Sequence, residues 1–145
     1  MAVVRHSYKT ARCILYREGS AARTSEFFLA VHSSFWGRQH RRWGLPGGQI
    51  ERGESPQDAV ARELEEELSL YLPDMLEVGP YPYKRSLHMV YAAEVTEPIR
   101  DWDDTELLDI GWFSIEDVRE MRTRNRLHAN YELHAIEALL QKLGD

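Results

Sequence analysis

The stretch that decides the fold runs from Gly48 to Leu70 and reads GQIERGESPQDAVARELEEELSL. Its second half predicts a helix from about Pro56 to Ser69. Ser55 is a favourable N-cap residue, Pro56 suits the first helical position, and Asp58 adds a variant of the capping box. The stretch therefore combines a glycine turn, a polar loop and an acidic helix.

Carboxylates cluster along one stripe of the predicted helix. Glu63, Glu66 and Glu67 stand at positions i, i+3 and i+4, which share a face at about 100° per residue. A separate apolar stripe, centred roughly 110° away on the same geometry, comprises Val60, Leu64 and Leu68. The acids thus border the face expected to be buried, where a cleft can form.

This acidic cluster is unfavourable for a helix alone. Glu63 and Glu67 repel each other by a few tenths of a kcal/mol, Glu65 adds another negative charge, and Arg62 offsets only part of the repulsion. A divalent cation would offset much more, because carboxylate oxygens are the ligands that Mg²⁺ prefers. Glutamates without His or Cys fit Mg²⁺ or Mn²⁺ better than Zn²⁺. We therefore predict Mg²⁺ as the cofactor, with Mn²⁺ as a substitute.

The whole stretch resembles the Nudix box of the MutT-like hydrolases. That motif reads Gly-x5-Glu-x7-Arg-Glu-U-x-Glu-Glu-x-Gly-U, with U a bulky aliphatic residue. Gly48, Glu54 and the run from Arg62 to Leu70 match every defining position except the last glycine, which is Ser69 here. The resemblance implies a Nudix fold and the metal-assisted attack of water on the phosphorus of a diphosphate linked to another moiety, X.

The resemblance also implies a set of metal ligands. Glu66 and Glu67 correspond to the principal ligands, Glu63 to a ligand or a base, and the carbonyl of Gly47 to a further ligand. Ser69 lies beyond these positions, but the helix then ends without the residue best suited to a left-handed cap.

Two further catalytic assignments complete the implied site. Arg62 and Glu54 correspond to a pair that crosses the junction of loop and helix and orients the acids. Some members of the family use a base outside the box. Glu106, in the acidic loop before residues 107–113, is the candidate for that role, with a solvated loop carboxylate as the alternative.

The rest of the chain reads as a mostly β sequence punctuated by helices. Apolar, aromatic or β-branched runs predict strands at residues 10–17, 26–32, 43–45, 76–83, 87–95 and 107–113. Helices are expected at residues 114–121 and 130–143. Because strands and helices do not alternate strictly, we predict an α/β (α+β) fold, a mixed β-sheet sandwiched between α-helices, in a single domain over residues 1–145.

Two segments mix aromatic and basic residues and are candidates for substrate binding. Arg38, Arg41, Arg42 and Trp43 lie just upstream of the box, and Tyr83 lies downstream of the helix. Such residues stack on a base and pair with phosphate. Packing in the core explains the aromatic residues equally well.

Composition limits the cellular setting and the partners. The net charge of −6 argues against broad nucleic-acid binding, and the single Cys13 excludes a disulfide framework. No apolar run approaches the ~20 residues of a membrane span. We expect a cytoplasmic protein that acts on a small nucleoside diphosphate derivative, with no membrane and no stable nucleic-acid partner; a homodimer is left open.

Three functions fit these observations. The first is a hydrolase of nucleoside triphosphates, dinucleotides or nucleotide sugars. The second is a Nudix-fold module that binds a nucleotide without cleaving it, although such a module would not need all of Glu63, Glu66 and Glu67. The third is an isoprenyl diphosphate isomerase, which by family analogy requires a catalytic cysteine in a specific motif, and Cys13 lies in none.

Overall fold

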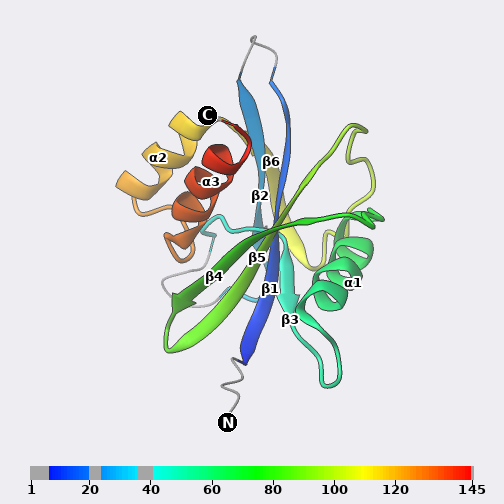
Figure 1. Cartoon of the computed structure of the whole chain (residues 1–145). Helices are drawn as coiled ribbons and strands as arrows, with labels where there is room; N and C mark the ends of the chain where they lie inside the picture. The colour runs from blue at the N-terminus through cyan, green and yellow to red at the C-terminus, as the bar shows by residue number, and fades with distance from the viewer. Residues whose placement is uncertain (1–6, 20–23, 36–40, 145) are drawn as a thin grey trace.

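The computed structural model describes residues 7–19, 24–35 and 41–144 of the chain. These residues form a six-stranded sheet and three helices (Figure 1). The strands are β1 (Tyr8–Glu18), β2 (Ser25–His32), β3 (Gly47–Gln49), β4 (Leu76–Tyr83), β5 (Ser86–Glu94) and β6 (Leu107–Phe113). The helices are α1 (Pro56–Leu68), α2 (Ile115–Thr123) and α3 (Tyr131–Lys142).

The sheet is mixed and has helices on both faces. Its strand order is β4-β5-β1-β2-β6, with β3 paired to β1 outside this path. Strand β1 runs parallel to β5 and antiparallel to β2 and β3. Helix α1 covers one face of the sheet, and α2 and α3 cover the other (Figure 1). The predicted fold class is confirmed. Within the described ranges, no helix has the length and apolar character needed to cross a membrane.

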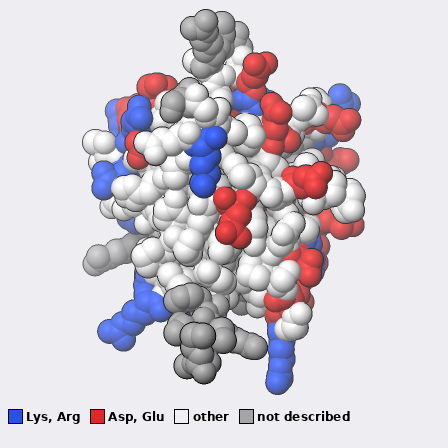
Figure 2. Space-filling view, viewed as in Figure 1, with Lys and Arg blue, Asp and Glu red and all other residues white. Residues whose placement is uncertain are grey.

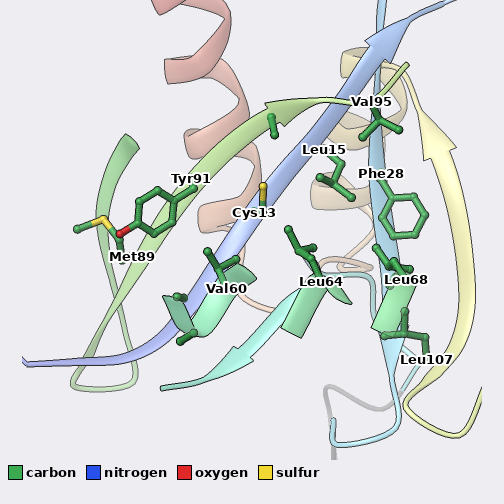
Figure 3. Packing of buried hydrophobic residues seen from close by; sticks show 14 residues of the cluster. Cys13, Leu15, Phe28, Val60, Leu64, Leu68, Met89, Tyr91, Val95 and Leu107 are labelled. Carbon is green, nitrogen blue, oxygen red and sulfur yellow. The ribbon is translucent and has the colours of Figure 1, made fainter. Parts of the chain in front are cut away.

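Strand β1 supplies the core on both faces through its alternation. Cys13 and Leu15 belong to the cluster that packs against α1, and Ile14 between them belongs to the cluster under α2 and α3. The apolar stripe of α1 lies against the first cluster, as Figure 3 shows for Val60, Leu64 and Leu68. This packing confirms the predicted buried face of the helix and fixes the direction of its acids.

The strand predicted at residues 43–45 is wrong, and a short strand forms slightly later at Gly47–Gln49. Trp43 and Gly44 make only isolated bridges, to Leu127 and Ala30. Ladder pairing with β1 begins at Gly47. The backbone can approach β1 there because glycine has no side chain, and a Cβ at this position would clash with the carbonyl oxygen of Ala11. The prediction favoured aromatic and apolar residues, whereas close approach to β1 requires glycine.

Helix α1 begins as predicted and ends on a strained residue. The Ser55 hydroxyl accepts the N–H of Asp58 at 3.1 Å. At the other end, Ser69 itself adopts the left-handed conformation, with φ 56° and ψ 32°, and its N–H donates to the Glu65 carbonyl at 3.0 Å. The helix therefore has the left-handed cap that the glycine of the motif would supply, with a serine in its place.

Helix α3 begins on a buried carboxylate. Asn130 precedes the helix without a side-chain cap, and the Glu132 carboxylate accepts the N–H of Ala129 at 3.2 Å instead. Glu132 is fully buried. Burial raises its pKa to about 7, although hydrogen bonds from the backbone oppose the shift.

We expect Ser69→Gly to raise the free energy of unfolding by about 0.5–1 kcal/mol, because a left-handed conformation costs an L-residue roughly 1–2 kcal/mol and glycine part of that in chain entropy. Urea unfolding would measure the change. Ser69→Ala is the matched control, since it removes the hydroxyl and keeps Cβ. A gain in the alanine variant equal to that in the glycine variant would contradict the backbone explanation.

We expect Glu132→Gln to stabilise the protein at alkaline pH. The carboxyl has a pKa of about 7 in the folded protein, against the ordinary 4.5. Its protonated form therefore stabilises the folded state fully below pH 4.5, and this stabilisation is lost as the pH rises through 7. By pH 8 the loss is on the order of 3 kcal/mol. The free energy of unfolding, measured between pH 5 and 8, should fall by this amount in the wild type and in the exposed control Glu97→Gln. It should fall less steeply in Glu132→Gln. Equal slopes in all three proteins would count against it.

Candidate active site

A cavity of about 370 Å³ opens beside the glycine turn. Its lining comes from β1, β3, α1 and the turn between β4 and β5, together with residues near Phe35, Glu106 and His128. Acids lie on one side, where Glu63 and Glu67 line the cavity. The cleft expected beside the helix carboxylates is present.

The glycine pair holds these acids by close contact. The Gly47 N–H donates to Glu67 Oε1 at 3.1 Å. A Cβ on Gly48 would lie only 2.7 Å from the Glu63 carboxyl carbon. Glycine is therefore required at both positions for different reasons. Gly47 allows the backbone to approach β1, and Gly48 leaves room for the Glu63 carboxylate.

Arg62 is the hub of an ion-pair network at the mouth of the cavity. It binds Glu54 with two bonds, Nε to Oε2 at 2.8 Å and Nη2 to Oε1 at 3.0 Å. Its Nη1 donates to Glu63 at 2.9 Å and to Glu66 at 3.3 Å. The hydrogen bond from Arg62 is the main cause that lowers the pKa of Glu54. The structure thus brings together the Arg62 and Glu54 that the motif pairs.

Burial is the largest influence on the pKa of both acids that line the cavity. Burial, followed by the charge of Glu63, raises the pKa of Glu67 to about 8, against the opposing effects of the Gly47 N–H and Arg12. Burial also raises the pKa of Glu63, and its hydrogen bond with Arg62 opposes the shift. Desolvated carboxylates of this kind favour a bound cation.

Carboxylate and carbonyl oxygens are suitable ligands for a hard divalent cation. The expected ligands do not all point to one place in this structure. In the described part of the chain, no three His, Cys, Asp or Glu side chains form a ready cluster for a metal. Glu66 does not line the cavity; its side chain is 60% exposed and pairs with Arg62. The Gly47 carbonyl accepts from Arg12 Nη1 at 3.1 Å. Glu63 and Glu67 are placed to bind a cation, and Glu66 would first have to leave Arg62.

Glu106 lies in the same cavity, outside the helix. Its carbonyl accepts the N–H of Ser33 at 2.8 Å, which fixes the loop against the end of β2. The loop also contacts α1, because the Asp103 N–H donates to the Glu67 carbonyl at 2.8 Å. The charge of Glu106 is among the causes that raise the pKa of Glu67. A carboxylate near the helix acids is therefore available from outside the motif.

Basic residues also line the cavity. Lys9, Arg12 and Lys84, here called the basic wall, all line it. Arg12 donates to the carbonyls of Leu45 and Gly47 at 3.3 and 3.1 Å, so it also braces the glycine turn. None of the three was among the predicted site residues. The arginine comes from the middle of a strand, where no local pattern marks it as functional.

His32 is a buried neighbour of Glu67. Its Nε2 lies 3.0 Å from the Leu45 carbonyl, which can only accept, so Nε2 holds the proton. Its Nδ1 is 3.7 Å from Glu67 Oε2. Burial is the main cause that lowers the pKa of His32 to about 3. The imidazole is therefore neutral, and it supplies no positive charge to the carboxylate.

Aromatic rings line the cavity and pack on one another. Phe35 stacks on His128 with ring centroids 3.7 Å apart, and Tyr83 meets the edge of the same imidazole at 5.4 Å. The Tyr83 hydroxyl donates to the His128 carbonyl at 3.3 Å. Tyr83 is the predicted substrate-binding residue that reaches this cavity. His128 lines the cavity as well.

The other substrate-binding candidates that the structure describes lie elsewhere. Arg38 is outside the described residues. Arg41, Arg42 and Trp43 do not line the cavity of the acids. Trp43 packs edge-on against Phe113 at 4.9 Å, in a separate groove beside α2. The aromatic and basic composition of this segment did not reveal which way its side chains point.

Comparison with known proteins identifies the family. Residues 7–133 match the family described as NUDIX domain. The chain is 32% identical over 130 residues to diphosphoinositol polyphosphate phosphohydrolase 2 of Rattus norvegicus, covering 85% of this chain and 68% of that protein. It is also 32% identical over 133 residues to diphosphoinositol polyphosphate phosphohydrolase 3-alpha of Homo sapiens, covering 85% and 74%.

Solved structures share the fold at lower identity. The NUDIX domain of Shewanella oneidensis NrtR, complexed with ADP ribose, aligns with a TM-score of 0.74 at 21% identity, covering 97% of this chain and 90% of that chain. A C. elegans Ap4A hydrolase aligns with a TM-score of 0.68 at 22% identity, covering 92% and 99%. The family match spans most of the chain and agrees with the acids of the cavity, so this chain belongs to the Nudix family and is a pyrophosphohydrolase.

Proposed function

We propose that the chain hydrolyses the diphosphate bond of a nucleoside diphosphate derivative, with Mg²⁺ bound by Glu63, Glu66 and Glu67. The observation that supports this most directly is that buried Glu67 and half-buried Glu63 line one cavity, with the pKa of each raised by burial. A bound divalent cation bridges phosphate oxygens, neutralises developing charge and lowers the pKa of bound water. Mn²⁺ offers the same ligand preferences and should substitute.

The residues of the chain prepare this site in distinct ways. Gly47 fixes Glu67 through its N–H and offers its carbonyl as a further ligand, shared with Arg12. Arg62 holds Glu54 and steadies Glu63. Glu66 would have to leave Arg62 to hold the cation, and the two bonds between Arg62 and Glu54 do not depend on Glu66, so they would still join the loop to the helix.

We assign the general base to Glu106. A base must accept the proton of the attacking water, and carboxylates that bind the cation are less basic once bound. Glu106 lines the cavity, lies outside the motif and is joined through its loop to α1 and β2. Glu63 and Glu67 remain the alternatives inside the motif.

The substrate class has support from two directions. Structural neighbours include one complexed with ADP ribose and an Ap4A hydrolase, which favours a nucleoside diphosphate derivative. The relatives near 32% identity are diphosphoinositol polyphosphate phosphohydrolases, which favours a second candidate, a diphosphate on a phosphorylated X. Both are small anionic molecules that need cations in the site.

The isomerase alternative finds no support in the cavity. Cys13 has no exposed surface and packs in the core against α1, and burial raises the pKa of its thiol. A buried, protonated thiol is a poor nucleophile or acid-base group. Hydrolysis through the carboxylates is therefore the chemistry that the site favours.

We expect Glu67→Gln to lower kcat by at least ~10²-fold, since it removes a metal ligand from the site of charge stabilisation. Release of phosphate or nucleotide products with Mg²⁺ would measure it. Glu65→Gln is the matched control, because Glu65 lies on the same helix and does not line the cavity. Turnover that is equal in the two variants would remove Glu67 from the ligand set.

We expect hydrolysis to require a divalent cation and to be selective among diphosphates. A panel should include ADP-ribose, diadenosine tetraphosphate, a nucleotide sugar and a diphosphoinositol polyphosphate, each incubated with Mg²⁺, Mn²⁺ or EDTA. Activity with either cation and none with EDTA is the expected result. Tight binding of one compound without cleavage of any would favour the binding module instead.

A further inference from the structure

The turn between β4 and β5 holds two residues in a costly backbone conformation. Tyr83 pairs with Ser86 across a two-residue loop. Both loop residues are left-handed, Lys84 with φ 49° and Arg85 with φ 64°. Hairpin turns of this type favour Asn-Gly, because each L-residue with a longer side chain costs roughly 1–2 kcal/mol in that region. Strain of this kind is often found at functional sites.

The strained turn delivers only one of its cations to the cavity. Lys84 lines the cavity, whereas Arg85 is not among the lining residues. The Lys84 ammonium lies 5.5 Å from the centre of the Tyr83 ring, a cation-π contact that holds it near the opening. Figure 2 shows Lys or Arg side chains projecting at the end of the molecule where Figure 1 places this turn. The two turn residues can therefore be compared in experiments. Both are basic and both have a left-handed backbone, but only Lys84 lines the cavity.

Lys84 completes a wall of like charges. Strand β1 runs beside β5, where Thr10 pairs with His88, and this register brings Lys9 and Arg12 alongside the β4–β5 hairpin. Arg12 and Lys9 lower the pKa of His88, after burial, and Arg12 and Lys84 do the same to His128. The three cations therefore act on the histidines that line the same cavity.

The basic wall offers charge rather than an open stacking face. Phe35 is 6% exposed and stacks on His128, and Tyr83 packs on the same imidazole. The rings that a base would need are already in contact with one another. Ser86 adds a hydroxyl group beside the cations, whereas the Thr10 hydroxyl is hydrogen-bonded to His88 Nδ1 at 2.7 Å. Ammonium, guanidinium and hydroxyl donors together recognise phosphate oxygens.

We propose that the basic wall of Lys9, Arg12 and Lys84 is a phosphate subsite, which binds a phosphate monoester carried by X within the same cavity as the metal-binding acids. The inference rests on the proposed function and narrows it to substrates whose diphosphate is linked to a phosphorylated X.

Inositol hexakisphosphate is a suitable probe, since it has phosphate monoesters and no diphosphate bond. Its binding would be measured by calorimetry in EDTA, which leaves the metal site out of the measurement. We expect Lys84→Gly to weaken binding by about tenfold or more, the scale of one charge-assisted contact. Arg85→Gly should leave the dissociation constant within about threefold, while both variants raise Tm by roughly 3–5 °C through relief of strain.

Three outcomes would overturn the proposal: no binding to the wild type, equal weakening by both variants, or no weakening by Lys84→Gly. If Lys84→Gly folds poorly, Lys84→Asn serves instead, because asparagine also tolerates the left-handed conformation. A protein that binds the probe through Lys84 and hydrolyses nothing would sink the proposed function alone, so the two failures are distinguishable.

Discussion

The close approach of the Gly47–Gly48 backbone to β1 and α1 is the constraint on which the site depends. A side chain at Gly47 would strike the Ala11 carbonyl, and one at Gly48 would strike the Glu63 carboxylate. Without these contacts, β3 could not pair with β1 and the Gly47 N–H could not reach Glu67. One short piece of backbone therefore joins the sheet to the acids, and the geometry of the acids follows from the packing of the sheet.

The cavity is lined by both acids and cations. The acids come from α1 and the Glu106 loop, and the cations come from β1 and the β4–β5 turn. A diphosphate would use both, because carboxylates can hold a divalent cation against it while ammonium or guanidinium groups bind its oxygens directly. Arg12 links the two sets, since it binds the carbonyl of the glycine that fixes Glu67. The net charge of −6 says little about this arrangement, which is local.

Sequence reasoning succeeded where the geometry is local and failed where it is not. The spacing of Glu63 and Glu67 determines their common face, because a helix has a fixed period. The pairing of Arg62 with Glu54 follows from the motif. Lys9 and Arg12 could not be found this way, because their place in the cavity depends on the parallel register of β1 with β5. Trp43 shows the converse: composition suggested substrate binding, and the fold directs it to Phe113.

His32 lies beside Glu67 but does not supply the positive charge that a metal ion would supply. An imidazolium beside Glu67 would neutralise the carboxylate and weaken its need for a cation. Instead, Nε2 keeps its proton and donates it in a hydrogen bond to the Leu45 carbonyl at 3.0 Å. Nδ1 is then unprotonated, and it lies 3.7 Å from Glu67 Oε2. A second proton would have to enter a site where burial and the charge of Arg12 oppose it. The histidine therefore helps to keep Glu67 short of positive charge, which is the condition under which a divalent cation binds there most favourably.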